Sequence, residues 1–214
     1  METTTKQAQD FYQVIRERRS VRHYDPTFKI SEQELKEILT EATLAPSGAN
    51  LQPWKFIVFN DQAVKEQLLP IANNQQQVVD ASAVIAVLGD LEGFKQVDKI
   101  YSAAVESGYM TEDIKELLVG NITQGFSHLP SDALKNGVMI DCGLVSMQLM
   151  LVAKARGYDT VPMAGFDAAK LIEAFSIPER YTPVILIAIG KAAKAAHPSS
   201  RLPVEDVTFW NGIS

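Results

Sequence analysis

Cysteine and histidine are scarce in this chain of 214 residues, and their scarcity excludes several kinds of site. The single cysteine, Cys142, cannot form an intramolecular disulfide or a thiolate metal cluster. It lies in the apolar stretch 137–152, where we expect a buried and unreactive thiol. The three histidines, His23, His128 and His197, are scattered and lack metal-ligand spacing, so the sequence predicts no metal site.

Long hydrophobic runs and net positive charge are also missing. The longest uninterrupted apolar runs, 83–88 and 184–189, are far shorter than the roughly 20 residues that cross a bilayer. The first ten residues are polar, unlike a secretory signal. The net charge of −6 disfavours nonspecific binding to nucleic acid or to anionic membranes. We therefore expect a cytoplasmic protein with no nucleic-acid partner and no membrane partner.

Several glycine-dependent catalytic fingerprints are absent. No Gly-rich dinucleotide motif follows an early predicted strand, no phosphate-binding loop ends in Gly-Lys-Ser/Thr, and no Gly-x-Ser-x-Gly elbow occurs. The composition is otherwise ordinary, with 46% hydrophobic and 21% charged residues, as in globular domains. Because the sequence also lacks internal repeats and low-complexity blocks, we expect a single domain over residues 1–214.

Hydrophobic periodicity predicts a few strands among many helices. The predicted strands are 54–59, 81–88, a short one at 160–163, and 182–190. The predicted helices are 11–19, 31–44, 61–69, 131–156 and 167–175, with a weaker pattern over 95–118 that glycines interrupt. Ser31, Asp61 and Asp167 are the predicted N-cap residues of three of these helices. The helix at 131–156 has few polar faces, so we expect it to run through the core. Together these elements predict an α+β fold.

The C-terminal arm, residues 191–214, has little periodicity but carries the aromatic pair Phe209 and Trp210. Such aromatics are unusual on a free tail. The arm could pack on a second subunit or close over its own core, and the residue pattern does not separate these two arrangements.

Four cations, Arg16, Arg18, Arg19 and Arg22, fall within seven residues of an otherwise acidic protein. One interpretation is a solvated helix terminus, where arginines interact favourably with the helix dipole. The other is a binding site for one phosphate monoester. Guanidinium groups offer paired donors that match phosphate oxygens, and Ser20 adds a hydroxyl donor.

Side-chain amides and hydroxyls are concentrated in two loops that precede predicted strands. The first loop, 45–54, carries Ser47, Asn50 and Gln52 between prolines that would stiffen it. The second, 73–77, reads Asn-Asn-Gln-Gln-Gln. These residues could be ordinary turn residues. They could also bind a polar heterocycle, because an amide both donates and accepts hydrogen bonds.

Arg-Arg-Ser-Val-Arg at 18–22, followed after a helix by Ala-Pro-Ser-Gly-Ala-Asn-Leu-Gln-Pro-Trp-Lys-Phe at 45–56, closely resembles the FMN-dependent nitroreductase family. The resemblance continues through residues 74, 80–82, 162–167 and 201 and is weakest over 93–130. It implies a nitroreductase-like α+β fold with a central mixed β-sheet surrounded by helices. It also implies a domain-swapped homodimer with two FMN molecules at the subunit interface, and an arm, 191–214, that packs on the partner subunit.

The resemblance further implies which residues bind FMN. Arg18, Arg19, Ser20 and Arg22 match the segment at the phosphate and ring, and Pro46, Ser47, Gly48, Asn50 and Gln52 match the loop that the other subunit presents. Asn74 matches a residue at the ring edge, with Gln77 nearby, Ala164 and Gly165 match a turn facing the ring, and Arg201 matches a tail cation at the phosphate. Ala164 stands where some members carry Glu, and Ser199 where some carry Lys.

The implied activity is hydride transfer from NADH or NADPH, through FMN, to a nitroaromatic, a quinone or a similar small planar oxidant by a ping-pong mechanism. The resemblance assigns no catalytic side chain, since the cofactor carries the chemistry. The same fold would also suit an enone reductase, a flavin reductase, a dehalogenase or a non-catalytic flavin-binding module. Four aromatics of the least matched stretch could stack on the acceptor or simply pack on helix faces: Phe94, Tyr101, Tyr109 and Phe126.

Overall fold

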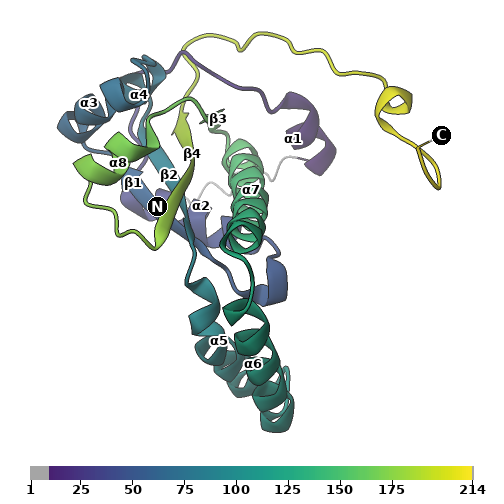
Figure 1. Cartoon of the computed structure of the whole chain (residues 1–214). Coiled ribbons are helices and arrows are strands. Elements are labelled where there is room, and N and C mark those ends of the chain that lie inside the picture. The colour runs from purple at the N-terminus through teal and green to yellow at the C-terminus, as the bar shows by residue number, and fades with distance from the viewer. Residues whose placement is uncertain (1–9, 214) are drawn as a thin grey trace, which may run out of the picture.

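The computed structural model describes residues 10–213, which form a four-stranded sheet covered by helices on both faces (Figure 1). The strand order is β1 (Trp54–Phe59), β2 (Ala83–Asp90), β4 (Tyr181–Gly190) and β3 (Asp159–Met163). The predicted strands are confirmed with boundaries that shift by two residues at most. The α+β fold class is confirmed as well.

All pairs among these four strands are antiparallel, which corrects the expectation of a mixed sheet for the described part of one chain. Parallel pairing is confined to an isolated bridge between Ser20 and Thr160, at the outer edge of β3. Antiparallel neighbours follow from the connections, because each strand re-enters the sheet from the end at which its neighbour stopped.

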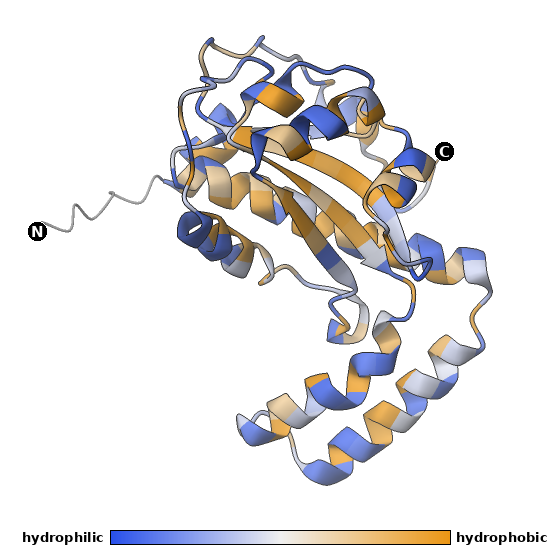
Figure 2. Ribbon diagram, turned by 90° about the vertical axis from the view of Figure 1, so that its left-hand side faces the viewer, coloured by the Kyte–Doolittle hydropathy of each residue, from blue (hydrophilic) through white to orange (hydrophobic). Residues whose placement is uncertain are grey.

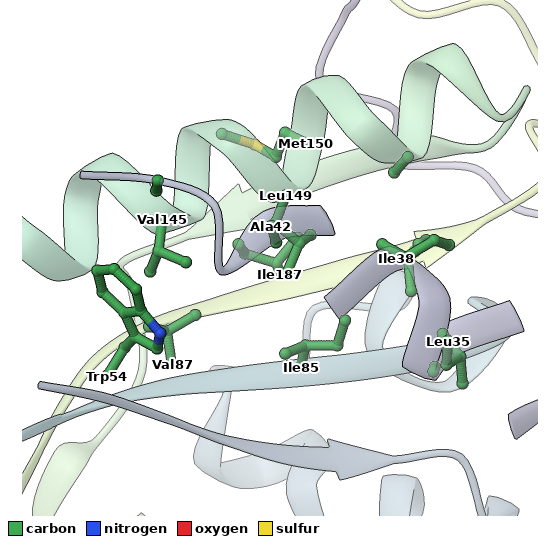
Figure 3. Packing of buried hydrophobic residues seen from close by; sticks show 14 of the residues in the cluster. Leu35, Ile38, Ala42, Trp54, Ile85, Val87, Val145, Leu149, Met150 and Ile187 are labelled. Carbon is green, nitrogen blue, oxygen red and sulfur yellow. The ribbon is translucent and has the colours of Figure 1, made fainter. Parts of the chain in front are cut away.

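The two central strands bury both of their faces, which explains their uninterrupted apolar sequences. Ile85, Val87 and Ile187 point toward α2 (Glu32–Ala42) and α7 (Ser131–Ala155), where they pack with Leu149 (Figure 3). The alternate residues of β2 and β4 face a second cluster. It is covered by α3 (Gln62–Ile71), α4 (Gln77–Asp80) and α8 (Ala168–Ala174).

Side-chain caps fix the starts of three helices, as the sequence predicts. Ser31 Oγ accepts the Glu34 N–H at the start of α2. Asp61 caps α3 and Asp167 caps α8 in the same way. The first helix, α1 (Phe11–Glu17), is shorter than predicted, and the one-turn helix α4 escaped prediction because four residues carry no periodicity.

The weak pattern at 95–118 corresponds to a hairpin of two helices, α5 (Val97–Glu106) and α6 (Glu112–Ser127), entered through a 3₁₀ turn, η2 (Gly93–Gln96). The hairpin extends away from the sheet (Figures 1 and 2). Its turn includes Gly108 at φ +74°, a left-handed conformation that favours glycine. Since the hairpin has its own small apolar cluster, it keeps its shape at a distance from the main cores.

Helix α7 is central to the fold but is buried along one side only. Cys142 is fully buried, and burial raises the pKa of its thiol to about 12, which confirms the expected unreactive cysteine. The opposite side exposes Ile140, Leu144 and Met147. Within residues 10–213, α7 is the single helix that is long and apolar enough to cross a membrane by length and composition, although it packs against α2, β2 and β3.

The described part of the arm, 191–213, runs away from the body and holds only one 3₁₀ turn, η3 (Val204–Val207) (Figure 1). Its apolar side chains, Leu202, Val207, Phe209 and Trp210, are exposed. In this chain the arm therefore does not close over its own core, which was one of the two arrangements left open by the sequence.

Candidate functional site

The arginine-rich segment leaves α1 in an extended conformation and lies along the edge of β3. The Val21 N–H donates to Thr160 O at 3.1 Å, and the Tyr24 hydroxyl donates to Ala188 O at 3.2 Å. Val21 and Tyr24 are buried in the second core cluster, whereas Arg22 between them is exposed and Ser20 is half-buried. The buried anchors thus present the intervening polar side chains at the surface.

The start of the arm runs beside the same segment. Tyr24 forms an antiparallel bridge with Ala192, and the Ala193 N–H donates to His23 O at 2.8 Å. The approach is so close that a Cβ at Gly190 would lie 2.9 Å from Tyr24 Cδ1, so this position requires glycine. This contact holds the two ends of the chain, and hence their arginines, on one side of the sheet.

Arg18 and Arg201 form a cluster of positive charge without a counter-charge. Burial lowers the pKa of Arg18, and the nearby charges of Arg19 and Arg201 lower it further. Within residues 10–213, none of the ion pairs involves Arg18, Arg19, Arg22 or Arg201. Such a cluster suits a phosphate group, which would relieve the mutual repulsion.

Arg19 binds the protein itself through two backbone carbonyls, whereas Arg201 makes one such bond, from Nη1 to Ser200 O at 2.7 Å, and Arg19 is therefore the more fully engaged of the two. Arg19 Nη1 donates to Arg16 O at 2.5 Å and to Arg18 O at 2.9 Å, carbonyls at the end of α1. The two interpretations of the arginine cluster therefore apply to different residues. Arg19 stabilises a helix terminus, and Arg18 and Arg201 are available for an anion.

The amide loop and the turn after β3 lie together. Asn73 Nδ2 and Gln75 Nε2 both donate to Gly165 O at 3.0 Å. Asn74, at φ +55°, is exposed beside them, as is Ala164. These contacts place Asn74, Ala164 and Gly165 on one surface, as the family resemblance implies.

Gln77 is the exception in this loop, because its side chain is buried. Its Nε2 donates to Gln75 Oε1 at 3.0 Å and contacts Met163 Sδ at 3.4 Å. Its amide orders the loop from inside, and it orients Gln75 rather than facing solvent.

A buried lysine that the sequence analysis missed anchors the far side of this loop. Lys65 is fully buried, and its Nζ donates to Val79 O at 3.0 Å and to Ala81 O at 2.5 Å. Burial, with a contribution from Lys29, lowers its pKa to about 8. Nothing in the sequence distinguishes Lys65 from a surface lysine of an amphipathic helix.

The loop 46–52 is rigid and strained. Ala49, Asn50 and Gln52 have φ values of 49°, 52° and 47°, which side-chain-bearing residues rarely adopt. Ser47 Oγ accepts the Gln52 N–H at 3.0 Å, and Gln52 Nε2 donates to Asn50 O at 3.1 Å. Pro46, Gly48 and Asn50 remain exposed. Residues held in such conformations cluster at binding sites because the surrounding contacts fix them.

Two contacts from helices hold this loop in place. Asp141 of α7 accepts the Gly48 N–H at 3.1 Å, and the Tyr101 hydroxyl of α5 donates to Ala49 O at 3.1 Å. Burial raises the pKa of Asp141, while the Gly48 N–H opposes this change. The sequence analysis missed Asp141, although a lone carboxylate within an apolar helix was a signal that could have found it.

The structure places the loop 46–52 and the arginine cluster at opposite ends of β2. Ser20 forms a bridge with Thr160 of β3, and Thr160 pairs with Ile189 of β4. Ile189 in turn pairs with Ala83, so the arginine segment lies level with the start of β2. Pro53 accepts the N–H of Asp90 at the end of β2. Eight strand residues span roughly 23 Å at about 3.3 Å per residue. One chain therefore carries two partial sites.

The four aromatics singled out by the sequence have different environments. The rings of Phe94 and Phe126 stack with centroids 5.9 Å apart. Tyr101 packs inside the hairpin cluster, whereas Tyr109 is 84% exposed. Phe94 and Phe126 also border a cavity of about 230 Å³ next to Gly48 and Leu51. Two of the four thus line a space beside the loop.

Relatives with known names match almost the whole chain. A Bacillus subtilis protein named "Putative NAD(P)H nitroreductase YdgI" is 47% identical over 203 residues, which are 94% of this chain and 97% of that protein. The CLA biosynthesis enone reductase of Lactiplantibacillus plantarum is 35% identical and covers 93% of each chain.

A solved structure agrees with this. A protein from Exiguobacterium sibiricum, crystallised in complex with FMN, is 48% identical and superposes with a TM-score of 0.93, covering 97% of this chain and 100% of that one. The nitroreductase family model matches residues 15–191, which include the arginine segment, both polar loops and every strand. This protein belongs to the nitroreductase family.

Proposed function

We propose that this protein is an FMN-dependent oxidoreductase. Its reductant is NADH or NADPH, and its acceptors are nitroaromatics, quinones or similar planar oxidants, used in a ping-pong cycle. The observation that carries the proposal is the cluster of Arg18 and Arg201, which has no ion-pair partner within residues 10–213. The exposed amide of Asn74 adds a polar group next to the 164–165 turn. A related protein crystallised with FMN and relatives named as nitroreductases support it.

In this proposal, the chain's own residues bind and orient the cofactor. Arg18, Ser20 and Arg201 hold the phosphate, and Asn74 with the 164–165 turn holds the ring. FMN, when bound, supplies the hydride chemistry. Arg22 and the amide donors stabilise negative charge on the ring in a partly desolvated site. Arg19 and Gln77 act indirectly, by ordering the segments from which these groups project.

The second half of the site comes from a partner subunit in this proposal. The loop 46–52 is rigid, exposes Asn50 and lies roughly 23 Å from the arginine cluster along β2. Because one chain cannot bring the two halves together, we infer a homodimer with two equivalent sites. Each site combines the arginine cluster of one subunit with the loop of the other.

Two exposed apolar surfaces support the homodimer. One is the outer side of α7, with Ile140, Leu144 and Met147, and the other is the arm. The outer edge of β1 also borders a groove of about 810 Å³ that includes Lys55 and Phe56. We infer that each arm packs on the other subunit. The single domain, the cytoplasmic location and the lack of nucleic-acid or membrane partners remain part of this proposal.

Anaerobic stopped-flow reduction tests the proposal. The flavin-loaded protein is mixed with NADH or with NADPH, and the loss of flavin absorbance is followed. Reoxidation with a nitroaromatic, a quinone and an enone then ranks the acceptors. We expect reduction by at least one nicotinamide and parallel double-reciprocal plots in steady state. A bound flavin that stays oxidised with both nicotinamides would contradict the reductase proposal and favour a flavin-binding module.

Enone reduction is a second candidate. The 35% identical L. plantarum relative is named an enone reductase. The largely apolar cavity beside the loop 46–52 would suit an acceptor with a nonpolar substituent better than a charged one.

A further inference from the structure

A small, partly open cavity borders the loop 46–52 at Gly48 and Leu51. It has a volume of about 230 Å³ and is bounded by that loop, by η2, by the end of α6 and by the first half of α7. Its walls are mainly apolar, with Leu51, Phe94, Phe126, Leu134 and Val138 as the principal contributors. None of the residues assigned above to the phosphate or the flavin ring lines this cavity, apart from Gly48.

Missing side chains keep the cavity open. Gly137 on α7 borders it, and no described atom outside the adjacent backbone of α7 lies within 4 Å of the position that a Cβ would take there. Ala133, one turn earlier, also borders it. Phe94 stacks on Phe126 in the facing wall of the cavity. This stacking makes the wall rigid, so the wall does not move inward to fill the cavity.

The polar groups of the cavity already have partners. Asp90 is fully buried and is bound by Arg180, with Nε to Oδ1 at 3.0 Å. Asp141 accepts the Gly48 N–H. Arg180 compensates the charge of Asp90, whereas no cation among the described residues of the lining compensates that of Asp141, which would repel an anionic ligand. The chemistry therefore selects an uncharged, apolar group.

We propose that this cavity is the subsite for an uncharged aliphatic tail on the electron acceptor. The inference rests on the proposed function, which places Gly48 and Asn50 against the flavin of the partner subunit. The proposed acceptor therefore combines a planar oxidising group, such as a quinone or an enone, with an alkyl chain. At about 30 Å³ for each water-sized group, the 230 Å³ cavity has room for roughly seven to eight such groups.

A chain-length series tests this subsite. The acceptors are 1,4-benzoquinones with methyl to decyl substituents. Binding of redox-inert 4-alkylphenols of the same lengths to the flavin-loaded protein is measured by calorimetry. We expect kcat/KM and affinity to rise about fourfold per added methylene and to level off near seven carbons. Affinity that is independent of chain length, or that keeps rising to decyl, would overturn the proposal.

Two glycine variants localise the effect. Gly137→Leu puts a side chain into the cavity, and the ratio of octyl to methyl kcat/KM should fall to near one. Gly120→Leu on α6 is the matched control. Its Cβ also meets no described atom within 4 Å, but it does not border the cavity, so the ratio should remain that of the unmodified protein. An unchanged ratio in Gly137→Leu would overturn the assignment.

Failure of this inference is distinguishable from failure of the proposed function. If methylquinone is reduced but longer chains give no advantage, the oxidoreductase stands and the tail subsite does not. If NAD(P)H reduces no bound flavin, the proposed function itself fails, and the calorimetric series still reports whether the cavity takes alkyl chains.

Discussion

Two buried polar side chains next to the candidate site have opposite hydrogen-bonding environments. Lys65 is fully buried, and two backbone carbonyls accept its hydrogen bonds. Thr160 is also buried, but its Oγ1 has no partner within residues 10–213. Buried polar groups stabilise a fold only when they are paired, so substitutions at these positions should have opposite effects.

Lys65→Met should destabilise the protein more at high pH than at neutral pH. The folded pKa of about 8 lies below the usual 10.5, so the unfolded chain binds more protons between these values. Stability of the unmodified protein therefore rises with pH across this window, by up to about 3 kcal/mol, while the methionine side chain of the variant has no proton to lose. The neutral amine of the lysine keeps two N–H donors for its two carbonyls.

Urea denaturation at pH 7.5 and at pH 10 measures this difference. Lys36→Met, on the exposed side of α2, is the control for removing a lysine. The difference in free energy of unfolding between Lys65→Met and the unmodified protein should be larger at pH 10. An equal difference at the two pH values would refute the predicted pH dependence.

Thr160→Val should stabilise the protein by up to about 1 kcal/mol, because it removes a buried hydroxyl that lacks a partner within residues 10–213 and keeps the shape of the side chain. The urea midpoint should rise with an unchanged slope. A loss of stability would instead point to a bound water that pairs with Oγ1.

At the scale of elements, helices fix the loops of the candidate site. Asp141 of α7 and Tyr101 of α5 hold the loop 46–52, and Lys65 of α3 holds the end of α4. In each case a rigid element positions a segment whose own backbone is strained or irregular. The geometry of the candidate site therefore depends on residues that need not touch the cofactor.

Asp141→Asn should weaken FMN binding about tenfold while leaving the fold intact. The Gly48 N–H would lose a charged acceptor, and the loop would lose part of the rigidity that keeps three residues at positive φ. Flavin fluorescence titration measures the affinity. Asp132→Asn, exposed near the start of the same helix, is the matched control. Equal affinities in the two variants would argue against this role.

An ion pair between the half-exposed Arg180 and the fully buried Asp90 lies at the base of the α5–α6 hairpin. Arg180 binds both oxygens of Asp90, at 3.0 and 2.5 Å, immediately before the chain enters η2. Asp90→Asn should lower the free energy of unfolding by about 2–3 kcal/mol, because hydrogen bonds to a buried charge are lost. Lys95→Met, which removes the exposed pair with Glu92, should cost less than about 1 kcal/mol. Urea denaturation measures both free energies of unfolding. Similar decreases for Asp90→Asn and Lys95→Met would contradict the larger contribution assigned to Asp90.

At the scale of the whole molecule, the core of one chain is well packed, but its surface leaves apolar residues exposed and the two halves of the candidate site apart. The outer side of α7 and the arm expose apolar residues, and the two partial sites lie at opposite ends of β2. The homodimer proposed above would account for all three features. The proposed assembly and the proposed cofactor are therefore linked.

Truncation after Lys191 should cost both dimerisation and bound flavin, because it removes Arg201 and the exposed apolar residues of the arm together. Sedimentation should give a monomer, and the absorbance of bound flavin should be lost. Arg201→Ala separates the two effects, since it keeps the exposed apolar residues of the arm: it should weaken flavin binding while the protein remains a dimer. A truncated chain that remains a flavin-loaded dimer would refute the swapped arm.

The sequence by itself determined the strands, the helix caps and the family. Continuous apolar runs marked β2 and β4 because both strands are buried on two faces, and Ser31, Asp61 and Asp167 marked helix starts because a cap is a local interaction. The motif residues around 18–22 and 45–56 likewise identified the nitroreductase family, which the family model confirms.

Only the tertiary structure decided how these parts combine. It showed that Arg19 and Gln77 bond within the chain, that Asp141 holds Gly48, that Lys65 is buried, and that the loop 46–52 lies away from the arginines. Each of these depends on contacts that tertiary packing creates. Local periodicity carries no information about such contacts, because the same residue types in the same order can face solvent or a neighbouring element.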